Sequence, residues 1–452
     1  MDFKRFLGRY WLIKLFLFAT SFLLRVFHFP YLYYFYFRQL KNAPPQRQLF
    51  FQSRQEHGAI LVLLYYIRCW TNVRNGTVLV VFNPQYALIK KLAQQICPTA
   101  HIICPPVFLS NFVQKSLSGF MNKSVFPPLY NHFLRKYPDA VYIYGMEGSQ
   151  WPYVKHLDNV YKNRPHDSPF WDAYVQTMKE FDCRFDVNQD FFQLAEVSRG
   201  ISVDELLVRG LLNDLEIPGK YVVININIKD YSNQNDNIQH PVNFFAVKHF
   251  ERYNVLIDHL INNGYSVVLQ GTGEQPHFSP REGFIDYAHS VFQSVKNDFL
   301  LFGGCEFFVS SKTGAEWYGL ICDKPVLGLN YTELPLMQPC IRFRFFPKHI
   351  RDETGKHLSW RKVLTHPVFF QIGKSLPTQE TFEFVEMEEH EIIAAVDEFL
   401  QLLLKPREQW LNYSLLQSEF KQMLHPAHMD LYHISGVPCE AYLKEDAKVP
   451  SA

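Results

Sequence analysis

The chain has 452 residues, of which 47% are hydrophobic and 20% are charged, so it is long enough for two globular domains and has the composition of a folded protein. Its formal net charge of +1 gives no sign of the basic surface that nucleic-acid-binding proteins need. The eight cysteines are scattered without a CxxC pair, which favours reduced, buried thiols in a cytosolic protein over a disulfide framework or a zinc site.

The N-terminal segment, residues 1–40, is expected to associate with a membrane. Met1–Arg38 mixes Phe, Tyr, Trp and Leu with basic side chains, and its longest uncharged runs are shorter than the roughly 20 residues that a spanning helix needs. This pattern favours an interfacial segment at the cytoplasmic face of a membrane. Two alternatives stay open, namely a tilted single-pass anchor and a hydrophobic helix packed on the protein itself.

Alternating strands and helices predict a first α/β domain over residues 41–217. Apolar runs indicate strands at Leu49–Gln52, Thr77–Phe82, His101–Cys104 and Ala140–Tyr144. The long polar loop Gly145–Pro169 follows the last of these strands and is of the kind that carries function in α/β domains.

A second α/β domain is predicted over residues 218–405, after the boundary Glu216–Lys220. Its expected strands are Tyr221–Ile228, Tyr265–Leu269, Glu306–Val309 and Pro325–Leu329, and its expected helices are Lys248–Asn262, Arg281–Val295 and Ala315–Cys322. The pattern is less regular after Pro335, with strand-like runs at Ile341–Phe346 and Phe382–Val385, a short helix at Leu358–Leu364 and a strongly amphipathic helix at Glu388–Leu404. Residues 406–443 are predicted to be helical, with a helix at Glu408–Leu424, and residues 444–452 to be a disordered tail.

Polar loops follow three strands of the second domain, where parallel strands place ligand sites. The loop Ser310–Gly314 (SSKTG) combines hydroxyls, an ammonium and backbone N–H groups, which suits phosphate or ribose, although Ser311 or Thr313 capping a helix would explain most of it. Glu316, one turn into the next helix, can hold a sugar diol. The candidate donor-binding residues are Lys229, Asp230, Gly271, Ser310, Ser311, Lys312, Thr313, Gly314 and Glu316.

Several catalytic motifs are absent from the sequence. It contains no GxGxxG after the first strand of either domain, no GxxxxGK[ST], no GxSxG and no HExxH. It also contains no Asp-x-Asp, which argues against a transferase that holds a nucleotide diphosphate through a metal on paired aspartates. A metal-free site would instead use Lys, hydroxyls and helix N-termini.

The second domain resembles the C-terminal half of GT-B glycosyltransferases, in particular a bacterial family associated with surface polysaccharides. The resemblance runs through VVININIKDYS, LINNGYSVVLQG, FIDYAHS, KNDFLLFGGCEFFVSSKTG and KPVLGLNYTELP, then GKHLSWRKVL and FVEMEEHEIIAAVDEFL, in this order. It implies two Rossmann-like domains facing across a cleft. The family strand usually ends His-x-Arg-Asp, where this chain has Asn227, Ile228, Lys229 and Asp230, and the family tends to have an Arg where this chain has Leu269 and Gln270.

The resemblance implies a metal-independent transfer of a sugar from a nucleotide-sugar donor to the hydroxyl of a glycan, lipid-linked or protein acceptor, with no cofactor and no nucleic-acid partner. The SSKTG loop would contact the donor, flanked by Phe284–Ser290, and a general base from the first domain would take the acceptor proton. His57 and Glu56 are the first candidates for that base, and Glu147 and His156 the second. The alternatives are a non-catalytic nucleotide- or sugar-binding protein and a membrane scaffold on the same fold.

Overall fold

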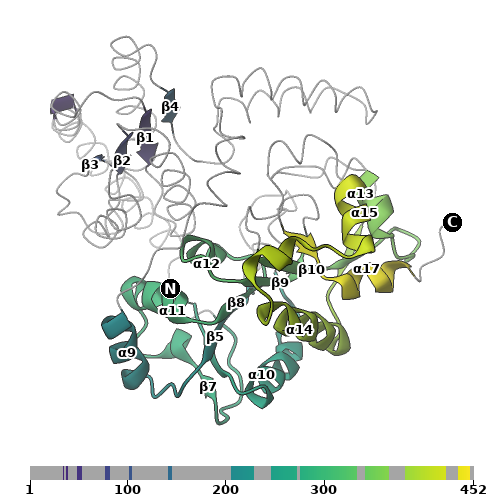
Figure 1. Cartoon of the computed structure of the whole chain (residues 1–452), viewed down its shortest axis with the longest axis horizontal. Coiled ribbons are helices and arrows are strands. Elements are labelled where there is room, and N and C mark those ends of the chain that lie inside the picture. The colour runs from purple at the N-terminus through teal and green to yellow at the C-terminus, as the bar shows by residue number, and fades with distance from the viewer. Residues whose placement is uncertain are drawn as a thin grey trace, which may run out of the picture. The chain divides into compact units, whose positions relative to one another are not determined.

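The computed structural model describes residues 34, 37 and 38, four strands near the N-terminus, and residues 205–228, 246–271, 275–332, 342–365, 382–423 and 436–447 (Figure 1). The chain divides into two units, Met1–Asn159 and Val160–Ala452. No helix in these described ranges is long and apolar enough to cross a membrane. The predicted interfacial segment Met1–Arg38 falls almost entirely outside them.

The first unit contains a four-stranded parallel sheet in the order β3-β2-β1-β4. The bounds are β1 Gln48–Gln52, β2 Thr77–Val81, β3 His101–Ile103 and β4 Val141–Tyr144. All four predicted strands of this unit are thereby confirmed to within a residue. The helices and the long loop predicted around them lie outside the described residues.

The second unit is mixed α/β and is built on a seven-stranded parallel sheet in the order β13-β10-β9-β8-β5-β6-β7. The bounds are β5 Tyr221–Asn225, β6 Ser266–Leu269, β7 Phe284–Ile285, β8 Phe307–Ser310, β9 Val326–Tyr331, β10 Phe343–Pro347 and β13 Val437–Pro438. Because β5, β6, β8 and β9 are buried along their whole length, their sequences are nearly continuous apolar runs, as parallel sheets require.

Helices cover both faces of this sheet (Figure 1). On one side α9 (Glu205–Asp214) packs against α11 (Val295–Gly304), which also contacts α12 (Glu316–Ile321). On the other side α10 (Tyr253–Asn262) packs against α14 (Glu389–Leu403). The sequence places α9 before the expected boundary at residues 217 and 218, but its contact with α11 joins it to the second unit.

Smaller elements complete the described part of the second unit. An antiparallel pair, β11 and β12, follows the main sheet, and α15 contacts both α13 and α17. The bounds are η4 Phe250–Arg252, η5 Tyr287–His289, β11 His349–Arg351, α13 Trp360–Thr365, β12 Glu383–Val385, η7 Arg407–Leu411, α15 Leu415–Met423 and α17 Glu440–Ala447.

Aromatic rings fill the core between sheet and helices, which accounts for much of the phenylalanine in this unit. Phe302 of α11 stacks on Tyr318 of α12 with ring centroids 4.9 Å apart and meets Phe308 of β8 edge-on. The thiols of Cys305, Cys322 and Cys439 are buried, as the sequence predicts, and burial raises the pKa of Cys305 to about 12.

The helix predicted at Arg281–Val295 is wrong. Gly283 has a left-handed φ of +79°, and the next two residues form the edge strand β7 beside β6. Ser294 then caps α11 by accepting a hydrogen bond from the Asn297 N–H at 3.2 Å. The helical pattern is overridden here because Phe284 and Ile285 pair with Val267 and Val268, a contact that sequence periodicity does not reveal.

The C-terminal elements also differ from expectation. The single helix predicted at Glu408–Leu424 is interrupted after Leu411, where Asn412 leaves helical geometry, and resumes as α15. Helix α17 continues past Lys444 to Ala447, although the composition from Lys444 onward predicts disorder. Helix α17 as a whole packs against α14 and α15, and its buried residues Tyr442 and Leu443 precede Lys444.

A buried acid–base pair joins distant parts of the second unit. Lys348, only 3% exposed, donates to the carbonyl of Ala246 at 2.7 Å and lies 3.4 Å from the Glu386 carboxylate. Glu386 also accepts the backbone N–H groups of Lys248 and His249 at 2.6 and 2.9 Å. Burial lowers the pKa of Lys348, and Glu386 opposes that shift.

We therefore expect Glu386→Ala to lower the local free energy of unfolding by about 3–5 kcal/mol, because it leaves a buried ammonium and two backbone N–H groups without their acceptor. Lys348→Met should cost clearly less, because Glu386 keeps both backbone donors. Native-state hydrogen exchange of peptides covering β5 and β10 measures both values. Exposed Glu353→Ala is the control, and equal costs for the two buried variants would contradict the asymmetry.

Candidate functional site

The strand order creates a topological switch point at the carboxyl edge of the second sheet. From β5 the chain moves to β6 and then β7, and it returns to the other side of β5 with β8. Helices α10 and α12, which come after β5 and β8 in the chain, lie on opposite faces of the sheet (Figure 1), and the strand order reverses between these two strands. In open α/β sheets this switch point is where ligands bind.

The loop 310–314 lies at this switch point. The Ser311 N–H donates to the Asn225 carbonyl at 3.2 Å, and the Asn227 N–H donates to the Ser311 hydroxyl at 2.6 Å. The side-chain amide of Asn227 reaches the Lys312 carbonyl at 3.3 Å. These bonds join the end of β8 to the end of β5 and fix the path of the loop.

The two serines of this loop point inward and the next three residues do not. Ser310 and Ser311 are fully buried, and the Ser310 hydroxyl accepts the Thr313 N–H at 3.3 Å. Lys312 and Thr313 are half-buried and Gly314 is exposed. Ser310 and Ser311 thus shape the loop, whereas Lys312, Thr313 and Gly314 are its solvent-accessible residues.

Lys312 sits in a left-handed backbone conformation, with φ +57°, which a non-glycine residue adopts only where the surroundings hold it. Its ammonium lies over the ring of Tyr331, 5.4 Å from the centroid. The Tyr331 hydroxyl donates to the carboxylate of Glu316. The Lys312 ammonium is therefore held in place by the Tyr331 ring, which is itself fixed by its hydrogen bond to Glu316.

Glu316 is 3% exposed, and its carboxylate also accepts a hydrogen bond from Ser310 at 3.5 Å. Its described partners belong to the protein itself, so its predicted contact with a sugar diol stays a prediction. Since α12 begins at Glu316 and is only six residues long, its dipole adds little to anion binding at the loop.

Gly271 follows β6 at the same edge, with φ +148°, and the Gln275 side chain folds over it. The Gln275 amide exchanges two hydrogen bonds with the backbone of Ile226, at 3.0 and 3.3 Å. The Asn225 amide donates to both the carbonyl and the side chain of Gln270. The ends of β5 and β6 are thus joined through side-chain amides.

The structure brings one part of the predicted donor site together. Gly271 and Ser310–Gly314 lie at the carboxyl ends of β6 and β8, which flank β5, as the sequence predicts. Lys229 and Asp230, and the candidate bases Glu56 and His57, lie outside the described residues, as do Glu147 and His156. Their roles stay predictions.

Two features of this edge have no counterpart in the sequence analysis. A buried carboxylate, Asp298 in the first turn of α11, lies against Gln270 and Tyr287. Three further side chains, His277, Asp286 and His289, gather beyond β7. Asp286 and His289 are three positions apart, whereas His277 joins them from another stretch of chain, a contact that has no sequence signature.

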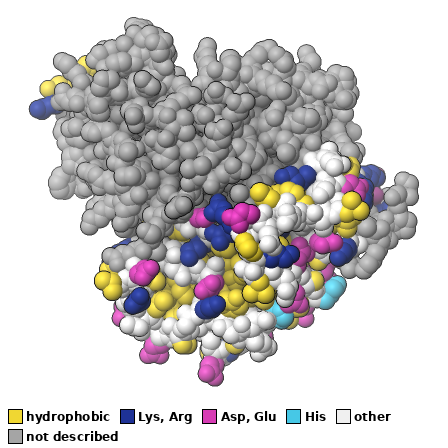
Figure 2. Space-filling model, viewed as in Figure 1, with side chains coloured by type: hydrophobic (Ala, Val, Ile, Leu, Met, Phe, Trp, Pro, Cys, Tyr) yellow, Lys and Arg dark blue, Asp and Glu magenta, His cyan; other side chains and the backbone are white. Residues whose placement is uncertain are grey.

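Basic and acidic side chains of the described residues are interspersed on the face shown in Figure 2. Arg281 pairs with Asp258 at 2.6 Å and Arg361 with Glu419 at 2.6 Å, both at the surface. Such pairs leave little unbalanced charge, in line with the formal net charge of +1.

No protein-family model and no curated protein matches the chain. Several of the solved structures that align with the chain are glycosyltransferases. Escherichia coli ADP-heptose LPS heptosyltransferase II aligns with a TM-score of 0.41 and 13% identity, over 78% of this chain and 98% of that one. A glycosyltransferase of family 9 from Veillonella parvula aligns with a TM-score of 0.38 and 10% identity, over 80% of this chain and 99% of that one.

A third similar structure is the iron-containing dodecameric glycosyltransferase TibC from enterotoxigenic E. coli. It aligns with a TM-score of 0.40 and 12% identity, over 80% of this chain and 78% of that chain.

The buried carboxylate predicts a pH effect on stability. Burial raises the pKa of Asp298 from its ordinary 3.8 to about 6, although hydrogen bonds from Gln270 and Tyr287 oppose the shift. Because the folded state holds this proton more tightly, its contribution to the free energy of unfolding falls as the pH rises from 3.8 to about 6. We expect the free energy of unfolding of Asp298→Asn to exceed that of wild type by roughly 1–3 kcal/mol above pH 6 and to equal it near pH 4.

Denaturant unfolding of wild type and variant across this pH range measures the difference. Glu306→Gln, at an exposed carboxylate just before β8, is the matched control and should run parallel to wild type. Parallel curves for Asp298→Asn and wild type would show that this carboxyl group titrates normally.

Proposed function

We propose that the chain is a glycosyltransferase that binds a nucleotide-sugar donor at the carboxyl edge of the seven-stranded sheet and transfers the sugar to an acceptor hydroxyl. The observation that carries the proposal is the position of Lys312, Thr313 and Gly314 at the switch point between β5 and β8. Backbone and hydroxyl donors beside a fixed ammonium suit a diphosphate. The resemblance of residues 221–404 to GT-B transferases supports the same site.

In the transfer, the acceptor oxygen bonds to the anomeric carbon, and the bond from that carbon to the diphosphate oxygen breaks. The diphosphate leaves with the bonding electron pair, and its growing charge is stabilised by Lys312 and by Lys229. A base takes the proton of the acceptor hydroxyl. His57 and Glu56 are the first candidates for this base, and Glu147 and His156 the second.

This mechanism needs no metal on the diphosphate, because cationic side chains and N–H donors take that role. The acceptor is proposed to be a glycan, a lipid-linked sugar or a protein, reached at the cytoplasmic face of a membrane through residues 1–40. The basic and aromatic composition of that segment supports this location.

Thermal unfolding with a panel of nucleoside diphosphates and nucleotide-sugars, in the presence of a chelator, tests the proposal. A ligand at about 100 times its Kd adds about 2.7 kcal/mol to the free energy of unfolding, which raises the melting temperature by several degrees. A shift with one nucleotide identifies the donor class. If the panel gives no shift, the donor site is wrong and the scaffold alternative gains weight.

Lys312→Ala should weaken binding of the identified nucleotide about tenfold or more, because it removes a charge-assisted contact to the diphosphate. Isothermal titration calorimetry measures the change. Lys220→Ala is the matched control, because Lys220 is exposed and directly precedes β5, at the opposite edge of the sheet. Equal affinities for all three proteins would place the diphosphate elsewhere.

Turnover separates the transferase from a non-catalytic binding protein. Release of the nucleoside diphosphate from its sugar donor, with membrane extract as acceptor source, should depend on Lys312. Binding without turnover would favour the non-catalytic alternative, to which the Gln270 and Lys229 departures from the family pattern also point.

A further inference from the structure

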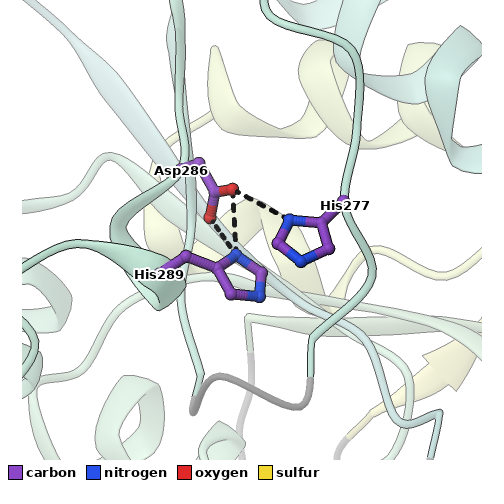
Figure 3. Close-up of side chains that lie close together, drawn as sticks. All are labelled: His277, Asp286 and His289. Carbon is purple, nitrogen blue, oxygen red and sulfur yellow. Dashed lines mark hydrogen bonds and ion pairs between the residues drawn. The ribbon is translucent and has the colours of Figure 1, made fainter.

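Two histidines and an aspartate converge beyond strand β7 (Figure 3). Asp286 directly follows β7, and His289 ends the 3-10 helix η5. His277 comes from the separate stretch of chain between β6 and β7. One ligand atom from each of the three residues lies within 4.8 Å of the others.

The ring nitrogens face the carboxylate. Nδ1 of His289 lies 2.7 and 2.9 Å from the two Asp286 oxygens, and Nδ1 of His277 lies 3.8 Å from Oδ2 (Figure 3). The two imidazole rings stack, with centroids 3.9 Å apart and planes inclined by 23°. Nε2 of His289 is buried and makes no hydrogen bond within the described residues, so this ring offers Nδ1 to the cluster.

We propose that His277, Asp286 and His289 bind a divalent transition metal of the zinc class. Imidazole nitrogen with carboxylate oxygen is a ligand set that Zn²⁺ takes, and three protein ligands leave one position for water or another ligand. The three ligand atoms lie within 4.8 Å of one another, so the exposed His277 has to move toward Asp286 and His289 to complete the site. His277 is 78% exposed, so the fourth position opens toward solvent.

The competing explanation is a local ion pair. Asp286 is the residue before η5, and His289 follows it by three positions, so these two would meet in any such turn. The turn does not account for His277, which lies nine positions before Asp286. Its ring comes from another stretch of chain and stacks on the ring of His289. A metal shared by all three would tie the β6–β7 connection to the end of β7.

The metal site is separate from the proposed diphosphate site, although both lie at the same edge of the sheet. The diphosphate loop follows β8, whereas Asp286 follows β7, and β5 and β6 stand between these strands. The inference does not rest on the proposed function, since zinc binding is measured without a nucleotide.

Zinc titration of the full chain, with affinity tags removed and metal stripped by chelator, tests the proposal. We expect wild type to bind one Zn²⁺ more per chain than His277→Ala. The affinity at this site should fall by more than the roughly 10–100-fold that the loss of an outer-shell partner costs. Zn²⁺ alone should also raise the melting temperature of wild type and not that of the variant.

Asp286→Asn is the second variant, because it keeps the shape of the side chain and removes the charge that a dication needs. His249→Ala is the matched control, since His249 is exposed and pairs with the single carboxylate of Glu251 at 3.1 Å. It should bind zinc as wild type does.

Either of two outcomes would overturn the metal site. In the first, wild type and His277→Ala bind the same number of zinc ions with the same affinity. In the second, the His249 control loses as much zinc binding as the cluster variants. Circular dichroism of each variant shows whether it is folded, so misfolding of His277→Ala or Asp286→Asn cannot be mistaken for loss of a ligand.

Discussion

The central strand β5 must be hydrogen-bonded on both edges, and this constraint organises the second unit. All five of its residues are buried, so each backbone group needs a partner within the protein. The chain supplies β6 on one side and β8 on the other. Because β6 and β8 lie on opposite sides of β5, the connections from β5 to β6 and from β8 to β9 run in opposite directions, and the switch point lies between β5 and β8.

The polar residues at this edge show how a parallel sheet ends without leaving buried groups unpaired. The Asn225 side chain donates to the Gln270 side chain, and the Gln275 side chain bonds to the backbone of Ile226. On the other side of β5, the Ser311 hydroxyl after β8 accepts the Asn227 N–H. These contacts hold the loop backbone in place before any ligand arrives. A preorganised loop binds an anion with less loss of conformational entropy than a mobile one.

The sequence predicted the long strands of both sheets well, because strands buried on both faces are continuous apolar runs bounded by Gly and Pro. It missed the two-residue edge strands β7 and β13, and β13 (Val437–Pro438) lies in residues 406–443, where a helical segment was predicted. It also placed the 310–314 loop correctly, since a loop after a parallel strand can lie at only one edge. It could not predict that Ser310 and Ser311 face inward, because that depends on Asn225 and Asn227, more than eighty positions earlier.

The sequence missed both strand β7 and the His277–Asp286–His289 cluster for one physical reason. β7 contains only two residues, and its identity as a strand comes from pairing with Val267 and Val268 rather than from its own pattern. The His277–Asp286–His289 cluster depends on the same pairing, since β7 sets where Asp286 leaves the sheet. Contacts between residues far apart in the chain leave no pattern in the local sequence from which they could be predicted.

The position of β5 in the sheet has a consequence for synthesis on the ribosome. β5, an interior strand of the seven-stranded sheet, is the first of its strands to emerge, and the bond from Asn227 to Ser311 spans 84 residues. At about 5–20 residues per second, the edge of YVVININI that pairs with β8 stays open for roughly 4–17 seconds. An apolar strand with open edges is a template for association with other chains. The stretch around Tyr221 is therefore where a nascent chain of this protein most needs a chaperone.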